Sequence, residues 1–263
     1  VDITIYQTVP FSVIPALILR MFGIKTAAIV HSMAEDSPKH GKLYKKILSL
    51  YTKMSMTLTK HVITVSNTKA EDIWKRYGKQ VQVLPCGVSV PKQNANMSNV
   101  LKINGIQKGR YFLTIGRIDP IKNLEDLIDA FLKHSPNGYQ LVIGGDVNSP
   151  YGETVVNRAK GNHNIIFPGI VSGDDKAMLL KNCLAYCLVS SSEGLPIALL
   201  EGMSYGKIPI VSEISAIKEV LSNYSIGLWN KVHSVEEVAD NMKLVEEHFT
   251  DVKFHGDKAL SIV

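Results

Sequence analysis

Residues 111–131, YFLTIGRIDPIKNLEDLIDAF, decide the fold of this chain. The apolar run at their start is typical of a buried strand, and the polar residues that follow predict a loop. The remainder has helical spacing, with Asn123 as a candidate N-cap. The same alternation recurs on both sides of this stretch. Because strands separated by helices predict parallel sheets with right-handed crossovers, we expect an α/β protein.

The alternation predicts where the other elements lie. Strands are expected at residues 2–7, 25–31, 61–66, 81–85, 139–145, 164–169, 184–191 and 208–212. Helices are expected at 15–22, 41–60, 67–77, 153–160, 174–182, 195–206, 215–222 and 235–248. Ser66 or Asn67 can cap the third helix and Gly78 can end it. The polar, Asn-rich residues 86–109 lack periodicity, so we expect domains at 1–90 and 110–263 joined by a linker at 91–109.

Charge is distributed unevenly along the chain. Residues 1–100 carry 13 Lys and Arg against 5 Asp and Glu, whereas residues 101–263 carry 16 against 19. This split suggests two bodies with different partners. The apolar content of 45% is ordinary for a soluble globular protein. The basic half has no recognised nucleic-acid-binding motif and no aromatic stacking platform, so we expect no nucleic-acid partner.

The cysteines argue against disulfides and zinc, and the N-terminal region argues against a membrane span. Three cysteines without a repeated C-x-x-C pattern argue against a disulfide framework and a zinc site, so Cys183 and Cys187 are expected in the core. The apolar stretch from Val9 to Gly23 is interrupted by two prolines and an arginine. It is shorter than the roughly 20 apolar residues of a membrane span. No signal peptide is visible, and a cytoplasmic location is expected.

The loop GRIDPIKN, residues 116–123, is the first candidate for a binding site. In open parallel sheets, ligands bind beyond the carboxyl ends of the strands. Gly116 allows a close backbone approach, and Arg117 and Lys122 place two cations near a helix N-terminus. This combination suits a phosphate or diphosphate. Two ordinary surface cations are the equally weighted alternative.

The segment SSSEGLPIALLEG, residues 190–202, is the second candidate. Glu193 and Glu201 are eight residues apart, and with a helix that starts near Leu195 both carboxylates could face one cleft. Carboxylates accept hydrogen bonds from vicinal hydroxyls of a ribose or hexose. The alternative makes Glu193 a first-turn anion and Glu201 a solvated helix position.

Two further strand ends carry weaker signals. His31 follows a strand directly, but a lone histidine is more often structural than catalytic. The sequence VIGGDV at residues 142–147 lacks the G-x-G-x-x-G spacing of a dinucleotide site. A tight turn at the end of a strand is a sufficient explanation for its glycines.

Together these segments resemble glycosyltransferase family 4, whose members are retaining enzymes of GT-B architecture. The resemblance runs from about residue 28 to residue 229, and it includes VHS, VITVSN, VQVLPCGV, IIFPGIVS and EGLPIALLEGMSYGKIPIVS as well as the loop at 116–123. It implies two Rossmann-like domains, a partial acceptor-side domain at 1–90 and a nucleotide-sugar-binding domain at 110–263. It also implies that the first domain is incomplete and that the chain is an N-terminally truncated fragment.

The resemblance assigns roles to individual residues. Arg117 and Lys122 would hold the donor diphosphate and neutralise the leaving nucleotide without a metal or cofactor. Glu193 would contact the donor sugar, and His31 would reach the transferred sugar, which completes the catalytic set. The resemblance also implies a set of donor-binding residues. Ile170 and Val171 would lie against the base, and Glu201 would bind the ribose. Gly116 would also contact the donor, as would Gly194 and Leu195 through their backbone N–H groups.

The function implied is transfer of a sugar from a UDP- or GDP-linked donor to a glycan or lipid-linked acceptor in cell-surface polysaccharide synthesis. A nucleotide-sugar-binding module without turnover and a UDP-sugar epimerase of GT-B shape are the alternatives. The helix at 41–60 has apolar residues at helical spacing and lysines on another face. Residues 39–60 could therefore dock on the anionic inner face of the cell membrane, or the lysines could simply be solvated.

Overall fold

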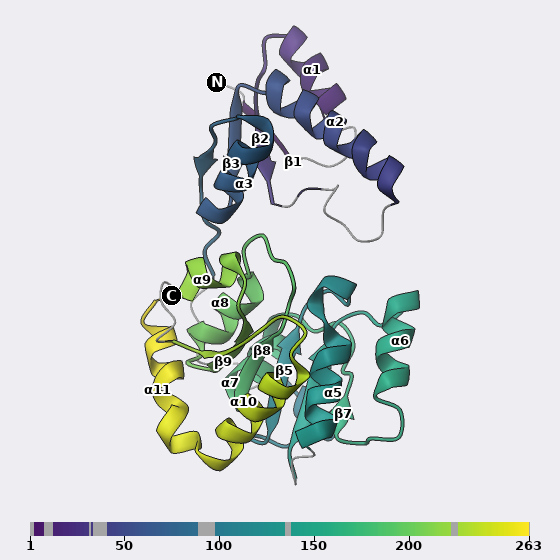
Figure 1. The fold of residues 1–263 in the computed structure, drawn as a ribbon, viewed down its shortest axis with the longest axis vertical. Helices are drawn as coiled ribbons and strands as arrows, with labels where there is room; N and C mark the ends of the chain where they lie inside the picture. The colour runs from purple at the N-terminus through teal and green to yellow at the C-terminus, as the bar shows by residue number, and fades with distance from the viewer. Residues whose placement is uncertain are drawn as a thin grey trace. The chain divides into compact units, whose positions relative to one another are not determined.

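The computed structural model describes residues 3–7, 13–31, 33, 41–88, 98–134, 138–221 and 226–262. The chain divides into two compact units. The first comprises Val1–Cys86 with Glu193–Leu195, and the second comprises Gly87–Ser192 with Pro196–Val263. Each unit is built on its own parallel sheet (Figure 1).

The first unit holds a four-stranded parallel sheet in the order β1(Ile3–Gln7), β2(Lys25–Val30), β3(His61–Thr64) and β4(Gln82–Val83). Its helices are α1(Val13–Met21), α2(Lys42–Leu58) and α3(Asn67–Tyr77). The predicted ends of α3 are confirmed: Ser66 accepts a hydrogen bond from the Lys69 N–H, and Gly78 ends the helix in the left-handed conformation at φ 65°.

Helix α2 turns an apolar face to solvent. Its buried residues are Leu48, Ser55 and Met56. The apolar stripe that the sequence places at helical spacing is exposed instead, and consists of Leu43, Ile47, Leu50 and Met54 at 75%, 56%, 70% and 45%. Helical periodicity shows that a stripe exists, but it does not show which face packs on the sheet.

The second unit holds a six-stranded parallel sheet in the order β10-β9-β8-β5-β6-β7. Its strands are β5(Tyr111–Ile115), β6(Gln140–Gly144), β7(Ile165–Ile166), β8(Ala185–Leu188), β9(Ile208–Ser212) and β10(Leu228–Asn230). Its helices are α4(Val100–Ile103), α5(Leu124–His134), α6(Pro150–Arg158), α7(Gly173–Asn182), α8(Ile197–Ser204), α9(Ser215–Leu221), α10(Val235–Glu247) and α11(Phe249–Leu260), and residues 120–122 form the 3-10 turn η2(Pro120–Lys122).

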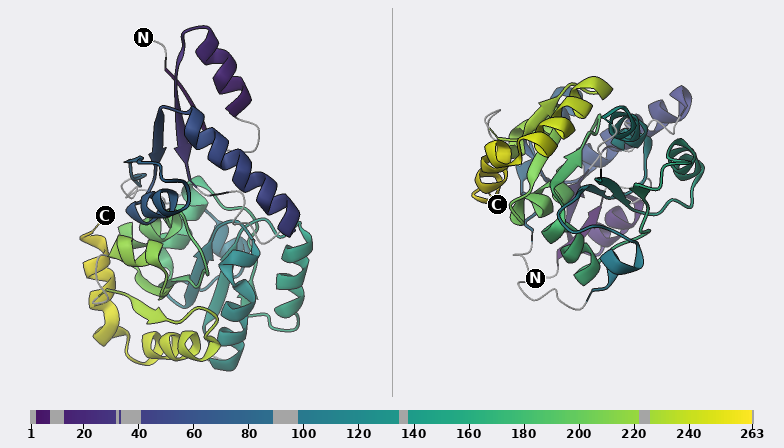
Figure 2. Two further views of the ribbon diagram at one scale, coloured as in Figure 1. Left: turned by 45° about the horizontal axis from the view of Figure 1, so that its top comes forward. Right: turned by 90° about the horizontal axis from the view of Figure 1, so that it is seen from below.

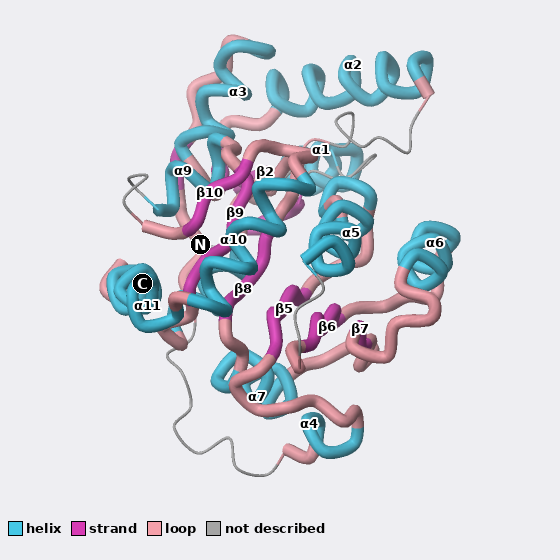
Figure 3. The backbone as a smooth tube through the Cα atoms, turned by 60° about the horizontal axis from the view of Figure 1, so that its bottom comes forward, coloured by secondary structure: helices cyan, strands magenta, loops and turns pink. Residues whose placement is uncertain are grey.

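Alternate residues of the central strands enter two different cores. Phe112 of β5 packs with α5, α6 and α10, whereas its neighbours Tyr111 and Leu113 pack with α4, α7, α8 and α9. Figure 3 shows α5 and α10 on one side of the sheet and α4 and α7 on the other. Because side chains alternate along a strand and both faces are covered, the strands are apolar at nearly every position.

Three elements of the second unit differ from the expectation. Helix α4 lies inside the predicted linker at 91–109, and its Val100 is buried against the second core. Strand β10 and helix α11 were not predicted. Helix α11 is yellow in Figure 2 and lies beside α10. It packs closely against the turn after α8, because a Cβ on Gly256 would lie 2.3 Å from the carbonyl oxygen of Gly206. Residues 91–97 of the predicted linker lie outside the described residues.

Candidate functional site

The strand order of the second unit contains a reversal between β5 and β8. From β5 the chain moves outward to β6 and β7, and it then returns to place β8 on the opposite side of β5, followed by β9 and β10. In open parallel sheets, ligands bind at the carboxyl edge where the strand order reverses. The loop that leaves β5 contains residues 116–123, the first stretch singled out in the sequence. The loop that leaves β8, residues 189–196, contains the start of the second stretch, whose remainder lies in α8.

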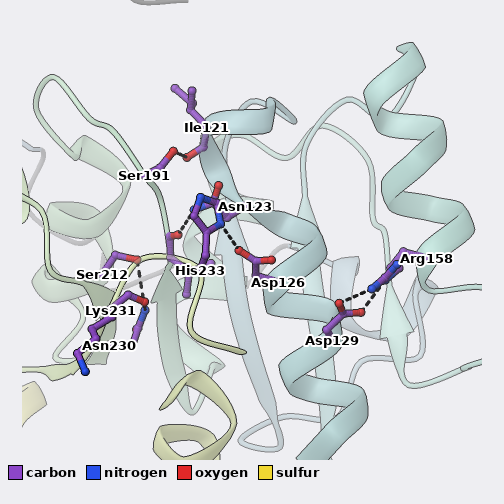
Figure 4. A network of polar contacts seen from close by, with 11 residues as sticks. Ile121, Asn123, Asp126, Asp129, Arg158, Ser191, Ser212, Asn230, Lys231 and His233 are labelled. Atoms are coloured by element: carbon purple, nitrogen blue, oxygen red, sulfur yellow. Dashed lines mark hydrogen bonds and ion pairs between the residues drawn. The ribbon is translucent and has the colours of Figure 1, made fainter. Parts of the chain in front are cut away.

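Backbone and side-chain hydrogen bonds join these two loops. The backbone N–H and the Oγ of Ser191 both donate to the carbonyl of Ile121, at 2.8 and 3.2 Å (Figure 4). The amide of Asn123 donates to the carbonyl of Val189 at 2.9 Å. Asn123 lies directly before α5, at the position predicted for the N-cap. Its side chain bonds the neighbouring loop, however, and its backbone adopts φ 49°. Two segments about 70 residues apart are thereby fixed together.

The two predicted phosphate-binding cations lie in the first of these loops. Arg117 is 76% exposed, and its Nε lies 3.7 Å from the carboxylate of Asp119. Asp119 is buried and its Oδ1 accepts the N–H of Ile121, which shapes the turn η2. Arg117 and the half-buried Lys122 line one small hollow together with Gly116. The structure thus brings Gly116, Arg117 and Lys122 to one place at the carboxyl edge.

The glycines of VIGGDV allow close packing under this hollow. A Cβ on Gly145 would lie 2.3 Å from the carbonyl oxygen of Gly116, and one on Gly144 would lie 3.1 Å from Val171 Cγ2. The backbone N–H of Gly116 donates to the carbonyl of Gly144 at 2.9 Å. These contacts agree with the expected tight turn at the end of a strand.

Glu201 forms an ion pair that the sequence did not reveal. Its Oε1 lies 2.5 Å from the Nζ of Lys176 on α7, and both side chains are about one-quarter to one-third exposed, at 26% and 31%. Since α8 begins at Ile197 and not near Leu195, Glu201 lies little more than one turn into the helix. Glu201 is thus partly exposed and paired with Lys176, and its proposed contact with a ribose stays a prediction.

Tyr205 reports the local electrostatics around this pair. Burial raises its pKa, and the negative charges of Glu201 and Asp174 raise it further. Two carboxylates therefore act on the same phenol, and Lys176 is the cation bonded to one of them.

Ile170 and Val171, predicted to contact the base, have different environments. Ile170 is 77% exposed, so its side chain is accessible to a ligand. Val171 is only partly exposed and packs against the core that includes Leu179 and Leu188. Packing against the core therefore explains most of why residue 171 is apolar. The periodicity of the sequence alone could not show this contact.

The remaining predicted residues belong to the first unit. His31 is exposed directly after β2. Glu193, Gly194 and Leu195 group with Val1–Cys86, and the last two precede α8 instead of forming its first turn. The proximity of His31 and Glu193 to Arg117 stays a prediction.

Other polar groups at the carboxyl edge escaped the sequence analysis. His233, at φ 63°, places its Nδ1 2.7 Å from Asp126 in the first turn of α5, and Asn230 donates to Ser212 at 3.3 Å (Figure 4). In the part of the chain that the structure describes, Ser190 Oγ and Asn230 Oδ1 are the buried side-chain atoms without a hydrogen-bond partner. No group of three His, Cys, Asp or Glu suited to a metal occurs within the described ranges.

Comparison with known proteins identifies the family. Residues 97–249 match the model for glycosyl transferases group 1, and residues 1–91 match the model for glycosyltransferase family 4. The chain belongs to the group 1 glycosyl transferases. The expected membership in family 4 is likewise confirmed. Both models together account for nearly the whole sequence.

Individual members of the family are similar to long parts of the chain. An uncharacterized glycosyltransferase of Methanocaldococcus jannaschii is 27% identical over 179 residues, which is 64% of this chain and 46% of that protein. An O-antigen chain mannosyltransferase of Salmonella typhimurium is 28% identical and covers 83% of this chain and 62% of its own length. The chain therefore spans about half to three-fifths of the length of these two relatives.

The fold is also found in a solved structure. Anabaena HepE, solved in complex with UDP and glucose, superposes with a TM-score of 0.82 at 17% identity, and the match covers 99% of this chain and 72% of HepE. The fold class is therefore the expected α/β GT-B type with Rossmann-like parallel sheets.

Proposed function

We propose that the protein to which this chain belongs transfers a sugar, with retention and without a metal, from a UDP- or GDP-linked donor to a glycan or lipid-linked acceptor. The observation that carries this proposal is the joining of the 116–123 and 189–196 loops at the strand-order reversal of the second unit. The family membership supports a transferase. Similarity to an O-antigen chain mannosyltransferase favours a role in cell-surface polysaccharide synthesis.

The proposed mechanism depends on charge stabilisation. As the bond between sugar and diphosphate breaks, negative charge grows on the departing nucleotide. In the proposal, Arg117 and Lys122, which line one hollow, stabilise that charge. Glu201 would accept the ribose hydroxyls, and Ile170 would contact the base. In the proposal, Glu193 and His31 approach the sugar, and the backbone of Gly194 and Leu195 donates to the donor.

Calorimetry with UDP- and GDP-sugars, paired with a donor-hydrolysis assay, tests this proposal. Lys122→Ala and Glu201→Ala should each weaken donor binding roughly tenfold to a hundredfold, because a hydrogen bond to a charged group contributes about 1.5–3 kcal/mol. Lys160→Ala, which removes an exposed lysine beyond α6, is the matched control and should leave binding unchanged.

Each result bears on a different part of the proposal. Binding without turnover would favour a binding module over a transferase, and epimerised sugar would favour an epimerase. Unchanged donor affinity in both Lys122→Ala and Glu201→Ala would remove the site assignment.

We further propose that α2 docks on the anionic inner face of the cell membrane. The exposed stripe Leu43, Ile47, Leu50 and Met54 is flanked along one edge by Lys42, Lys46 and Lys53, as expected from a helical period of 3.6 residues. An apolar face beside lysines suits an anionic bilayer surface. None of the helices in the described part of the chain has the length and apolar character that a membrane crossing requires. Residues 39–40 of the predicted docking segment lie outside the described residues.

Vesicle co-sedimentation tests this docking. The protein should bind vesicles that contain phosphatidylglycerol more strongly than pure phosphatidylcholine vesicles. Leu50→Glu should weaken binding about tenfold or more, since burying a leucine contributes about 1.5–3 kcal/mol. Leu84→Glu alters a comparably exposed leucine outside α2, 62% against 70%, and should have no effect. Equal losses in the two variants would contradict docking through α2.

A further inference from the structure

We propose that Lys176 is a positioning residue that orients the Glu201 carboxylate for the donor's ribose, and so sets the preference for ribonucleotides over deoxyribonucleotides. This inference rests on the proposed function, in which Glu201 binds the ribose hydroxyls. Its starting point is the 2.5 Å contact between Lys176 Nζ and Glu201 Oε1. The two residues lie 25 positions apart, on α7 and α8.

Both helices are fixed where the ion pair forms. Helix α8 buries Leu199 and Met203, and a Cβ on Gly202 would lie 2.8 Å from the ring of Tyr186. Helix α7 buries Leu179 and Leu180 in the same core. Since neither helix can shift without disturbing this core, the carboxylate of Glu201 meets an ammonium group held on a rigid element.

The bond to Lys176 restricts the carboxylate without exhausting it. A carboxylate has about four acceptor positions on its two oxygens. Among the residues that the structure describes, Lys176 is the partner of this carboxylate, so Oε2 and a lone pair of Oε1 stay available for two vicinal hydroxyls. A glutamate that is already oriented loses less side-chain entropy when a ligand binds.

Lys176 also balances local charge. Glu201 and Asp174 both raise the pKa of Tyr205, so the two carboxylates act on the same small region. Lys176 supplies the positive charge that bonds Glu201, at 2.5 Å and with both side chains less than one-third exposed, so water screens this attraction only in part. The orientation of the carboxylate, and not merely its presence, is therefore the property that Lys176 supplies.

Calorimetry with UDP and 2′-deoxy-UDP tests the proposal on the whole chain, with GDP and 2′-deoxy-GDP as the parallel pair. The unaltered protein should bind the ribonucleotide about tenfold more tightly than the deoxy form. Lys176→Met should reduce this ratio to about twofold, mainly by weakening ribonucleotide binding. Lys176→Arg should largely restore the ratio. Lys181→Met, which removes an exposed lysine of the same helix, should leave it at tenfold.

The outcomes separate this inference from the proposed function. A ratio that collapses in Glu201→Gln but persists in Lys176→Met would overturn the role of Lys176 while leaving the ribose site intact. A ratio near one in the unaltered protein would also overturn it. Failure of every uridine and guanosine nucleotide to bind would instead defeat the proposed function. A merely structural lysine would alter both affinities equally, and the ratio would not change.

Discussion

Gly145 shows how tightly the residues under the candidate phosphate loop are packed. Gly145→Ala should destabilise the protein by about 1–3 kcal/mol, because the added Cβ would lie 2.3 Å from the backbone oxygen of Gly116 and the backbone must move. Urea unfolding measures this loss. Gly116→Ala is the control, since a Cβ there would meet nothing within 4 Å, and its stability should change far less. Equal stabilities for the two variants would show that the turn relaxes easily.

The buried cysteines give a second prediction at the residue scale. Burial raises the pKa of the Cys183 thiol to about 12 and also raises that of Cys187. Both thiols should therefore stay protonated and unreactive in the native protein at pH 8, while the partly exposed Cys86 reacts. A thiol-labelling assay should count one fast group before unfolding and three after it. Rapid labelling of three groups in the native state would contradict this burial.

The same thiols imply a direction for stability at high pH. The pKa of Cys183 in the folded chain lies above its ordinary value of 9.0, so the unfolded chain releases this proton first. Stability from this group is complete below pH 9 and is lost progressively as the pH rises toward 12. Urea midpoints between pH 8 and 10.5 should therefore fall, and Cys183→Ala should flatten that fall. An unchanged slope in the variant would assign the effect to other groups.

At the scale of elements, α5 and α10 are joined by two polar side-chain contacts of equal length and different burial, one between a histidine and a carboxylate and one between a lysine and a carboxylate. His134–Glu246 and Lys133–Glu236 both measure 2.5 Å, but the first pair is 10% and 19% exposed and the second 53% and 68%. Glu246→Ala should lower the free energy of unfolding by about 1–2 kcal/mol, because it removes the hydrogen-bond partner of the largely buried His134 side chain. Glu236→Ala should leave stability unchanged within error, because water screens an exposed pair. Matched urea titrations would decide, and equal effects would show that burial is unimportant here.

At the scale of the whole molecule, the second unit has the features of an independent domain. Both faces of its sheet are covered by helices, and its two cores take residues from every one of its described helices. A fragment of residues 87–263 should therefore unfold in one cooperative transition and retain helical circular dichroism. A broad transition with strong binding of a hydrophobic dye would show that this unit needs the rest of the chain.

Sequence alone determined the features that depend on neighbouring residues. The alternation of apolar strands and helices, the capping of α3 by Ser66 and the left-handed Gly78 are all local, and the structure confirms them. The loop with Arg117 and Lys122 was also found from sequence, because a strand end followed by a helix places it at the carboxyl edge.

Only the tertiary structure decided the features that depend on packing between distant segments. Three features show this: the Lys176–Glu201 pair, the exposed stripe of α2 and the close packing of α11 at Gly256. Each of them depends on where the fold places a second element. Local spacing defines the period of a helix, but the burial of a face and the partner of a charge depend on what the rest of the chain places beside it.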